Sequence, residues 1–166
     1  QIMAGESIKV AVESHRVKMP FCMGSLYWQL NDCWPGASWS SLDYFGNWKA
    51  LHYYAKNFFT PLLIVISTKD DTLDVSIVND NNDINNSKLL LELIDFNGNS
   101  LNKHKLCVDI VSNSSKKVFS CDINSLLENH DKNNVILRSS IILEDKTLSS
   151  NDYFFVKPKE LALPKQ

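Results

Sequence analysis

Residues 62–79, which decide the fold, read Leu-Leu-Ile-Val-Ile-Ser-Thr-Lys-Asp-Asp-Thr-Leu-Asp-Val-Ser-Ile-Val-Asn. The stretch opens with an apolar run and closes with Leu73, Val75 and Ile77 alternating with polar residues. Such alternation is the pattern of an antiparallel strand with one buried face. The polar segment 69–71 between the two halves has the composition of a turn. Residues 62–79 therefore predict two strands joined by a tight turn.

The same signal continues to the end of the chain. Strands are expected over residues 62–67, 72–78, 88–96, 105–111, 117–123, 135–143 and 152–156, with one helical turn over 124–130. Segments rich in Asn, Asp, Gly and Ser separate them. About seven short strands in roughly a hundred residues are typical of an immunoglobulin-like sandwich, although no Cys-Trp-Cys pattern of the antibody type is present. We therefore expect a mainly β fold, with residues 61–166 forming one antiparallel β-sandwich.

The first sixty residues follow a helical period. A helix is expected over residues 5–17, ending before Pro20, because Ile8, Ala11, Val12 and His15 recur at helical spacing and share one face. Residues 23–30 have the pattern of a short buried strand. Asn47 is expected to cap a second helix, whose apolar stripe consists of Trp48, Leu51, Ala55 and Phe58.

A strand that lies between two helices belongs to a parallel sheet, and it needs hydrogen-bonding neighbours. Residues 1–60 offer only this one strand, so its neighbours are expected in a longer protein. We therefore expect residues 1–60 to be the last α-β-α segment of an α/β unit. If that unit closes into a (β/α)8 barrel, the strand end at residues 28–32 faces the mouth of the active site.

All four tryptophans lie within one 21-residue stretch, with Trp28 at this strand end, Trp34 and Trp39 in the loop over residues 31–46, and Trp48 just after it. Loops of this length in compact domains usually carry function. Indole rings are flat and apolar with a polar edge, so a cluster of them predicts a surface on which sugar rings stack. The alternative is an aromatic cluster that seals the junction between two packing units.

Composition argues against several other classes of protein. The net charge is −2, the pI is about 6.1 and the lysines are scattered, which is unlike a nucleic-acid-binding surface. No apolar run is long enough to predict a membrane span. The four cysteines form no CxxC pair and no zinc spacing, so no metal or cofactor is expected. Buried free thiols are expected, with a disulfide between Cys107 and Cys121 as the alternative. The compartment stays open, and a periplasmic, secreted or lysosomal location is compatible with the sequence.

Residues 24–35, Gly-Ser-Leu-Tyr-Trp-Gln-Leu-Asn-Asp-Cys-Trp-Pro, closely resemble the β-mannosidases of glycoside hydrolase family 2. Residues 38–43, Ser-Trp-Ser-Ser-Leu-Asp, and residues 46–53, Gly-Asn-Trp-Lys-Ala-Leu-His-Tyr, resemble the same family. There, these segments belong to the eighth strand and helix of the catalytic TIM barrel, and an immunoglobulin-like domain follows. The resemblance implies that residues 1–60 end such a barrel and that residues 61–166 form the domain after it.

The resemblance also implies an activity, the retaining hydrolysis of terminal non-reducing β-D-mannose residues. Two glutamates about 5 Å apart carry out such a reaction, one as acid/base and one as nucleophile. By resemblance both glutamates lie upstream, so no catalytic residue is expected in this chain and it is expected to be inactive alone. The implied partners are a β-mannoside oligosaccharide or glycan and the remainder of the barrel.

Four residues are candidates for substrate binding: Trp28, Asn31, Asp32 and Trp34. Trp28 matches the tryptophan that forms an apolar wall for the sugar in the reacting subsite, where its π face favours an oxocarbenium-like transition state. Asn31 and Asp32 are expected to bind sugar hydroxyls or a catalytic glutamate. The alternative is that they stabilise the loop through local hydrogen bonds to its backbone. Trp34 and Trp39 would line the rim of the pocket or pack beneath the loop.

Two hypotheses of another class stay open. In the first, the tryptophan cluster and the sandwich form a noncatalytic carbohydrate-binding module. In the second, the sandwich is a structural spacer that braces the barrel. We favour the spacer for residues 62–166, because no group of three exposed aromatic residues stands out there.

Overall fold

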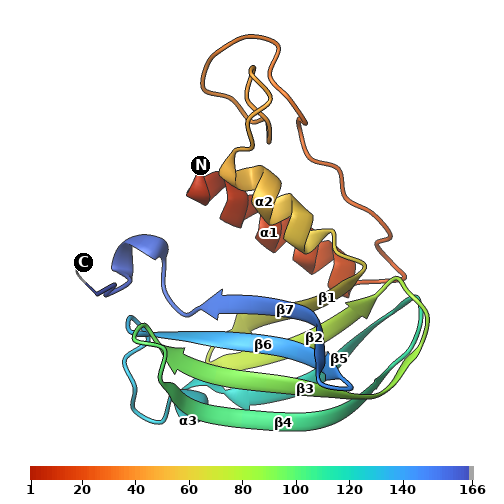
Figure 1. Ribbon diagram of the computed structural model, residues 1–166, viewed down its shortest axis with the longest axis vertical. Coiled ribbons are helices and arrows are strands. Elements are labelled where there is room, and N and C mark those ends of the chain that lie inside the picture. Colours follow the sequence, from red (N-terminus) through yellow and green to blue (C-terminus); the bar gives the residue numbers. More distant parts are fainter. Residues whose placement is uncertain (165–166) are drawn as a thin grey trace.

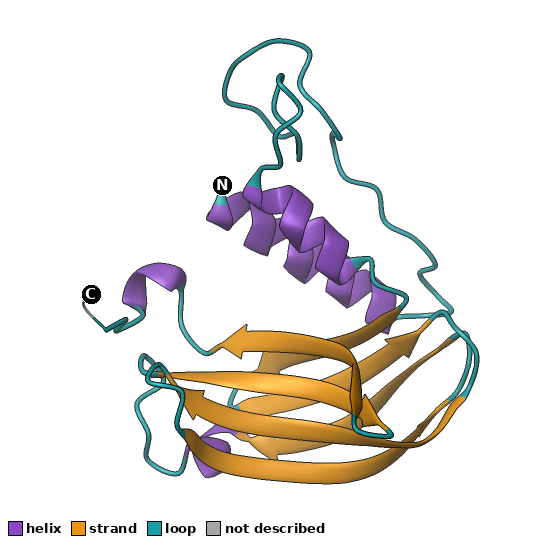
Figure 2. Ribbon diagram, in the orientation of Figure 1, coloured by secondary structure: helices purple, strands orange, loops and turns teal. Residues whose placement is uncertain are grey.

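The computed structural model describes residues 1–164, in which a pair of helices lies against a β-sandwich (Figure 1). The helices are α1 (Ile2–Val17) and α2 (Ala50–Phe58), and the loop that joins them projects away from the sandwich (Figure 2). The sandwich strands are β1 (Leu62–Lys69), β2 (Thr72–Asn79), β3 (Ile84–Asp95), β4 (Ser100–Ile110), β5 (Ser114–Asp122), β6 (Val135–Leu143) and β7 (Lys146–Phe154). A short helix α3 (Ile123–Leu127) precedes β6, and a 3-10 turn η1 (Pro158–Glu160) follows β7.

The strands form two antiparallel sheets, ordered β1-β2-β5 and β4-β3-β6-β7. The chain crosses from one sheet to the other after β2, after β4 and through α3. Between the sheets lie the alternate residues of each strand, among them Leu73, Leu89 and Leu137, which are completely buried. Burying such a side chain stabilises the fold by about 1.5–3 kcal/mol. The expected immunoglobulin-like antiparallel sandwich is confirmed.

A row of alternating charges crosses the outer face of the larger sheet. Glu92 on β3 lies opposite Lys103 on β4 and Arg138 on β6, and Arg138 lies opposite Asp152 on β7. The Lys103 ammonium is 2.8 Å from Glu92, and the Arg138 guanidinium binds both oxygens of Asp152 at 2.9 Å. A slip of one residue would turn these side chains into the apolar core, so the row helps to fix the register.

One loop sequence, Asp-x-x-Gly-Asn, occurs twice, over residues 43–47 and 95–99. In both copies one carboxylate oxygen accepts two backbone N–H groups, and the other accepts the side-chain amide of the asparagine. The two glycines have φ angles of +83° and +89°, which side-chain-bearing residues rarely adopt. The asparagine amide is the main reason why the pKa of each aspartate lies below its ordinary value. The first copy closes the projecting loop just before α2.

Apolar packing and one arginine join the helices to the sandwich. Val12 of α1 packs on Leu51, Ala55 and Phe58 of α2, and Val17 and Met19 cover Leu63, Val65 and Val78 on the outer face of β1 and β2. Arg16 donates to the carbonyl oxygens of Phe58 and Thr60 at 2.7 Å and pairs with Asp80 at 2.6 Å. These bonds fix the end of α2 against the first strand.

The strand expected over residues 23–30 is not formed, and that prediction was wrong. The segment is extended, but it pairs with no strand among the described residues. Its end is joined to the loop by backbone bonds from Ser41 to Gln29 and from Leu42 to Leu30, and by an isolated bridge between the following Asn31 and Leu42. A strand needs a neighbour for its ladder of hydrogen bonds. Residues 1–60 supply no such neighbour, as the sequence indicated.

Other expectations need smaller corrections. The last strand begins at Lys146 rather than at residue 152. Its inner side carries polar side chains, which conceal the alternation of a buried strand: Ser149 donates to the Leu62 carbonyl and Asn151 to the Ile64 carbonyl. Lys49, not Asn47, is the N-cap residue of α2.

Two expectations about burial also need correction. Trp48 precedes α2 and is 46% exposed, so it does not extend the buried stripe of that helix. All four cysteines are free, and Cys33 and Cys107 are exposed rather than buried.

Replacing Gly5 with alanine is expected to loosen the helix pair. A methyl group there would lie 2.6 Å from Cδ2 of Tyr54, closer than packed atoms allow. The overpacking cost of about 1–3 kcal/mol exceeds the gain in helix propensity of about 1 kcal/mol. Thermal unfolding followed by circular dichroism should give a lower midpoint for Gly5→Ala. Gly24→Ala, which places its methyl group in open space, is the control. An unchanged or higher midpoint for Gly5→Ala would contradict this packing.

Candidate functional site

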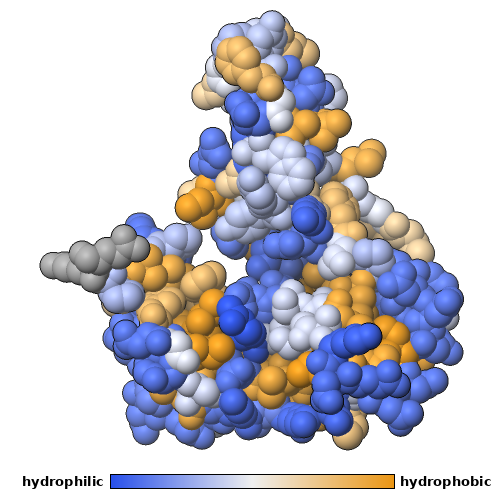
Figure 3. Space-filling model, viewed as in Figure 1, coloured by the Kyte–Doolittle hydropathy of each residue, from blue (hydrophilic) through white to orange (hydrophobic). Residues whose placement is uncertain are grey.

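The candidate residues all lie in the projecting loop between α1 and α2, which stands clear of the rest of the molecule in Figure 3. The side chains of Trp28 and Trp34 are about three-quarters exposed, at 76% and 74%, and Trp39 is exposed to 77%. Asn31 is exposed, whereas Asp32 is buried. The structure therefore leaves three indoles of one loop exposed and turns Asp32 inward.

One buried hydroxyl binds a residue on each side of Trp28, the side chain of Tyr27 and the backbone of Leu30. The side chain of Ser41, which is completely buried, accepts a hydrogen bond from the Tyr27 hydroxyl and donates to the Leu30 carbonyl, both at 3.0 Å. Backbone bonds from Ser41 to Gln29 and from Leu42 to Leu30 reinforce this attachment. The Trp28–Gln29 peptide bond is cis. Trp28 thus presents an exposed side chain from an anchored backbone.

The Ser41 hydroxyl also lies 3.0 Å from Nδ1 of His52. A serine hydroxyl within hydrogen-bond distance of a histidine resembles the nucleophile and base of a hydrolytic triad. Complete burial of Ser41 keeps its hydroxyl away from any substrate. The hydrogen bonds to Tyr27 and Leu30 give the hydroxyl a structural role instead. The Ser41–His52 pair therefore connects the loop to α2 and is not a nucleophile.

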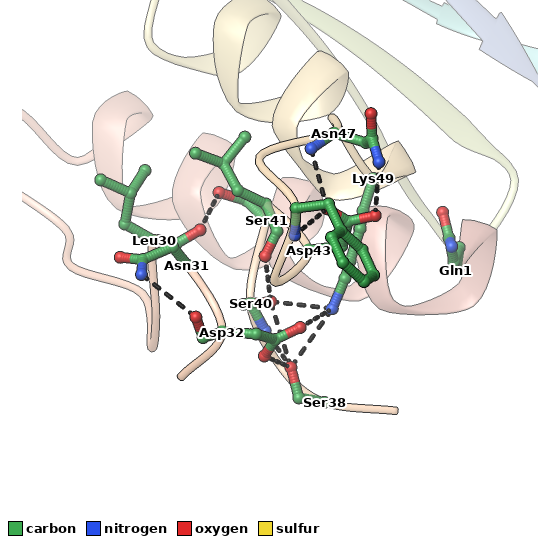
Figure 4. Close-up of polar contacts among 12 residues, drawn as sticks. Gln1, Leu30, Asn31, Asp32, Ser38, Ser40, Ser41, Asp43, Asn47 and Lys49 are labelled. Atoms are coloured by element: carbon green, nitrogen blue, oxygen red, sulfur yellow. Dashed lines mark hydrogen bonds and ion pairs between the residues drawn. The ribbon is translucent and has the colours of Figure 1, made fainter. Parts of the chain in front are cut away.

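The base of the loop is held by an ion pair (Figure 4). The Lys49 ammonium lies 2.7 Å from Oδ2 of Asp32, 2.8 Å from Oγ of Ser40 and 3.2 Å from Oγ of Ser38. Ser38 donates to the other Asp32 oxygen. Hydrogen bonding to Lys49, followed by that to Ser38, holds the pKa of Asp32 below its ordinary value. Asp32 is therefore an ionised carboxylate with both oxygens engaged inside the protein.

The site could be predicted only partly from the sequence. The sequence located the tryptophans, Asn31 and Asp32, and the structure adds Lys49, Ser38, Ser40 and Ser41. The three serines could have been noticed as small hydroxyl residues that interrupt an otherwise aromatic loop, whereas no local pattern marks Lys49. The Asn31 amide donates to the Asp32 carbonyl at 3.3 Å, and it remains exposed.

Chemically, the loop offers stacking faces and no free acid. Its two carboxylates, Asp32 and Asp43, are both held by internal hydrogen bonds. Within residues 1–164, no group of three or more His, Cys, Asp and Glu side chains is placed to hold a metal ion. No helix of that same range is long and apolar enough to cross a membrane.

The sandwich has little that would bind a sugar by itself. Its exposed large apolar side chains among the described residues are Val111, Leu148, Phe154 and, after η1, Leu163. Stacking platforms for glycans need aromatic rings, and Phe154 is the single aromatic residue of this group. The described sandwich surface therefore lacks an aromatic platform.

A groove of about 540 Å³ separates the helices from β7, and Glu13 of α1 lines it. The Glu13 side chain is 6% exposed and accepts a hydrogen bond of 3.3 Å from the Asn151 amide. Burial is the main reason why the pKa of Glu13 is raised to about 7. Lys9, Glu6 and Arg16 on the same helix add smaller electrostatic effects. The contact between α1 and the sandwich thus contains a carboxyl group that titrates near neutrality.

Comparisons with known proteins give one consistent result. A family model described as the mannosidase Ig/CBM-like domain matches residues 71–160, more than half of the chain. The β-mannosidase of Capra hircus is 44% identical over 87 residues, which cover 48% of this chain and 10% of that protein. β-Mannosidase A of Aspergillus oryzae is 28% identical over 158 residues, which cover 85% of this chain and 17% of that protein.

The crystal structure of the β-D-mannosidase from Dictyoglomus thermophilum superposes on this chain with a TM-score of 0.83 at 31% identity. The superposition covers 96% of this chain and 19% of that one, so it includes the helices and the loop as well as the sandwich. The chain therefore spans only about a tenth to a fifth of the length of these relatives.

Proposed function

This chain belongs to the mannosidase Ig/CBM-like domain family, and on that premise we propose that it is the C-terminal part of a retaining β-mannosidase. The complete protein would hydrolyse terminal non-reducing β-D-mannose residues of oligosaccharides or glycans. Residues 1–60 would complete the catalytic barrel, and residues 61–166 would brace it. The observation that carries this proposal is the loop of exposed indoles on an anchored backbone, next to an extended segment without sheet neighbours.

The extended segment supports the part about the barrel. Phe21, Met23, Leu26, Trp28 and Leu30 expose large apolar side chains, with Leu26 fully exposed. Apolar residues gathered in this way on one segment mark a surface that another part of a protein covers. A strand of a parallel barrel needs a neighbour on each side, and the remainder of the parent barrel would supply both.

The loop supports the part about the substrate. Trp28 would form an apolar wall for the mannose in the reacting subsite, and Asn31 and Trp34 would contact the sugar near it. Two glutamates from the upstream barrel strands would perform the retaining reaction. The carboxylates of this loop are already engaged, which agrees with a supporting role for it and with inactivity of the chain alone.

Hydrolysis assays test the proposal. The complete protein that carries this chain should release nitrophenol from a nitrophenyl β-mannoside, and the isolated chain should not. Calorimetric titration of the isolated chain with mannobiose should give no measurable heat of binding. Hydrolysis by the isolated chain, or its tight binding of mannobiose, would contradict the proposal and favour an autonomous module.

A further inference from the structure

We infer that Lys49 is a positioning residue of the sugar-binding loop. Through Asp32 and Ser38 it fixes the base of the tip over residues 33–37, and so it sets the places of the Trp34 and Trp39 indoles. This inference rests on the proposed function, because it assigns Lys49 to the same substrate site. Lys49 itself does not reach the substrate in this assignment.

The number of hydrogen-bond donors on the ammonium group supports that assignment. A lysine ammonium has three N–H donors. Three acceptors lie within 3.2 Å of Lys49 Nζ, namely Asp32, Ser38 and Ser40, and the Lys49 side chain is 13% exposed. No donor is left over for a sugar hydroxyl. Asp32, with a side chain 4% exposed, is equally occupied.

The ion pair lies at the two ends of the tip, residues 33–37, and so it can fix the position of the tip. Residues 33–37 are all exposed, so their position depends on the anchors at their two ends, Asp32 and Ser38. Both anchors bind the same ammonium, and Lys49 lies at the N-cap of α2. Trp34 lies inside this closed loop, and Trp39 lies between two serines that bind Lys49. One group at the rigid helix thus holds both aromatic residues.

Loss of Lys49 would leave the Asp32 carboxylate buried without a cation. A buried charge deprived of its partner is strongly destabilising, so water would enter and the base of the loop would open. Arginine at this position keeps the positive charge and offers five donors in a planar fork, so it would restore the contact with Asp32 in part. Methionine fills a similar volume without charge.

The test compares Lys49→Met, Lys49→Arg and Lys117→Met in the complete protein. Lys117 forms an exposed ion pair of 3.1 Å with Asp74 on the sandwich, so its replacement removes a lysine–aspartate pair far from the loop in the sequence. We expect Lys49→Met to lower kcat/KM for a nitrophenyl β-mannoside by about 10- to 100-fold, as displaced substrate contacts do. Lys117→Met should leave it unchanged, and Lys49→Arg should recover part of the loss.

A spectroscopic measurement on the 166-residue chain separates positioning from general stability. Its four tryptophans all lie at residues 28–48, so its indole fluorescence reports on this loop alone. Lys49→Met should lower the fluorescence anisotropy and increase quenching by acrylamide, while the far-UV thermal midpoint of the sandwich stays the same. Ser38→Ala, which keeps the charge pair, should give a smaller change in the same direction.

The outcomes are distinct. An active complete protein in which Lys49→Met keeps both kcat/KM and anisotropy overturns the inference and leaves the proposed function standing. The inference is also overturned if Lys49→Arg is as defective as Lys49→Met while Lys117→Met is normal, or if Lys117→Met is as defective as Lys49→Met. A complete protein without β-mannosidase activity overturns the proposed function first, and the inference falls with it.

Discussion

Raising the pH from about 4 to about 8 is expected to cost the folded chain about 3 kcal/mol through Glu13 alone. The Glu13 pKa is raised by burial from 4.5 to about 7, and each unit corresponds to about 1.4 kcal/mol. Because the folded state binds this proton more tightly than the unfolded state, the stabilising contribution is complete below pH 4.5. It is lost as the pH rises toward 7 and stays lost above that value.

Glu13→Gln should remove this dependence, because the amide resembles the protonated acid. Urea unfolding followed by circular dichroism should show the variant about 3 kcal/mol more stable than the parent at pH values above about 8, and equal to it near pH 4. Glu92→Gln is the control of opposite sign. The hydrogen bond from Lys103 lowers the Glu92 pKa, so that variant should lose stability at neutral pH and approach the parent in acid. Equal pH profiles for Glu13→Gln and the parent would refute the burial argument.

Replacing Trp28 with alanine should reduce kcat/KM of the complete protein on a nitrophenyl β-mannoside by about 100-fold. Loss of an aromatic face contributes about 0.5–1.5 kcal/mol beyond the buried area, and loss of its attraction to a developing positive charge up to about 2 kcal/mol. Together these amount to about 3 kcal/mol, which is a factor of about 100 in rate.

Two variants control for general effects of this substitution. Trp28→Phe keeps an aromatic face and should retain most of the activity. Trp48→Ala removes an indole that packs on His52 and Tyr53, with ring centroids 4.4 and 5.0 Å apart, and it should affect stability more than kcat/KM. If Trp28→Ala keeps full activity, Trp28 does not line the reacting subsite.

Local sequence patterns predicted the sandwich well because the apolar positions of most strands can be recognised within each strand's own sequence. The burial of Leu73, Val75 and Ile77 needs no knowledge of distant residues, and the structure confirms it. The one-sided exposure expected of this strand holds only at its start, because Ser76 and Val78 are buried too, the latter under residues at the end of α1 and just after it. The start of β7 was missed because Ser149 and Asn151 point inward to bind carbonyl groups of β1. With polar residues on its inner face, the strand does not show the alternation of apolar and polar residues. The strand over residues 23–30 was wrong for a different reason, since a strand exists only with a neighbour.

The candidate site divides in the same way. Trp28 and Trp34 were found by their unusual density, which is a property of the sequence alone. Lys49 and Ser41 were missed because their roles depend on contacts across the loop, with Lys49 17 positions from Asp32 and Ser41 14 positions from Tyr27. No periodicity marks a residue whose partner lies at such a distance in the chain.

Amide hydrogen exchange over residues 23–31 tests most directly the claim that this chain completes a barrel supplied by the rest of a longer protein. In the isolated, monomeric chain we expect fast exchange there and slow exchange in β3 and β6, which lie inside the larger sheet. In the complete protein the same segment should become strongly protected, because the neighbouring strands would bind its amides. Strong protection in the isolated monomer, or fast exchange in the complete protein, would contradict the account.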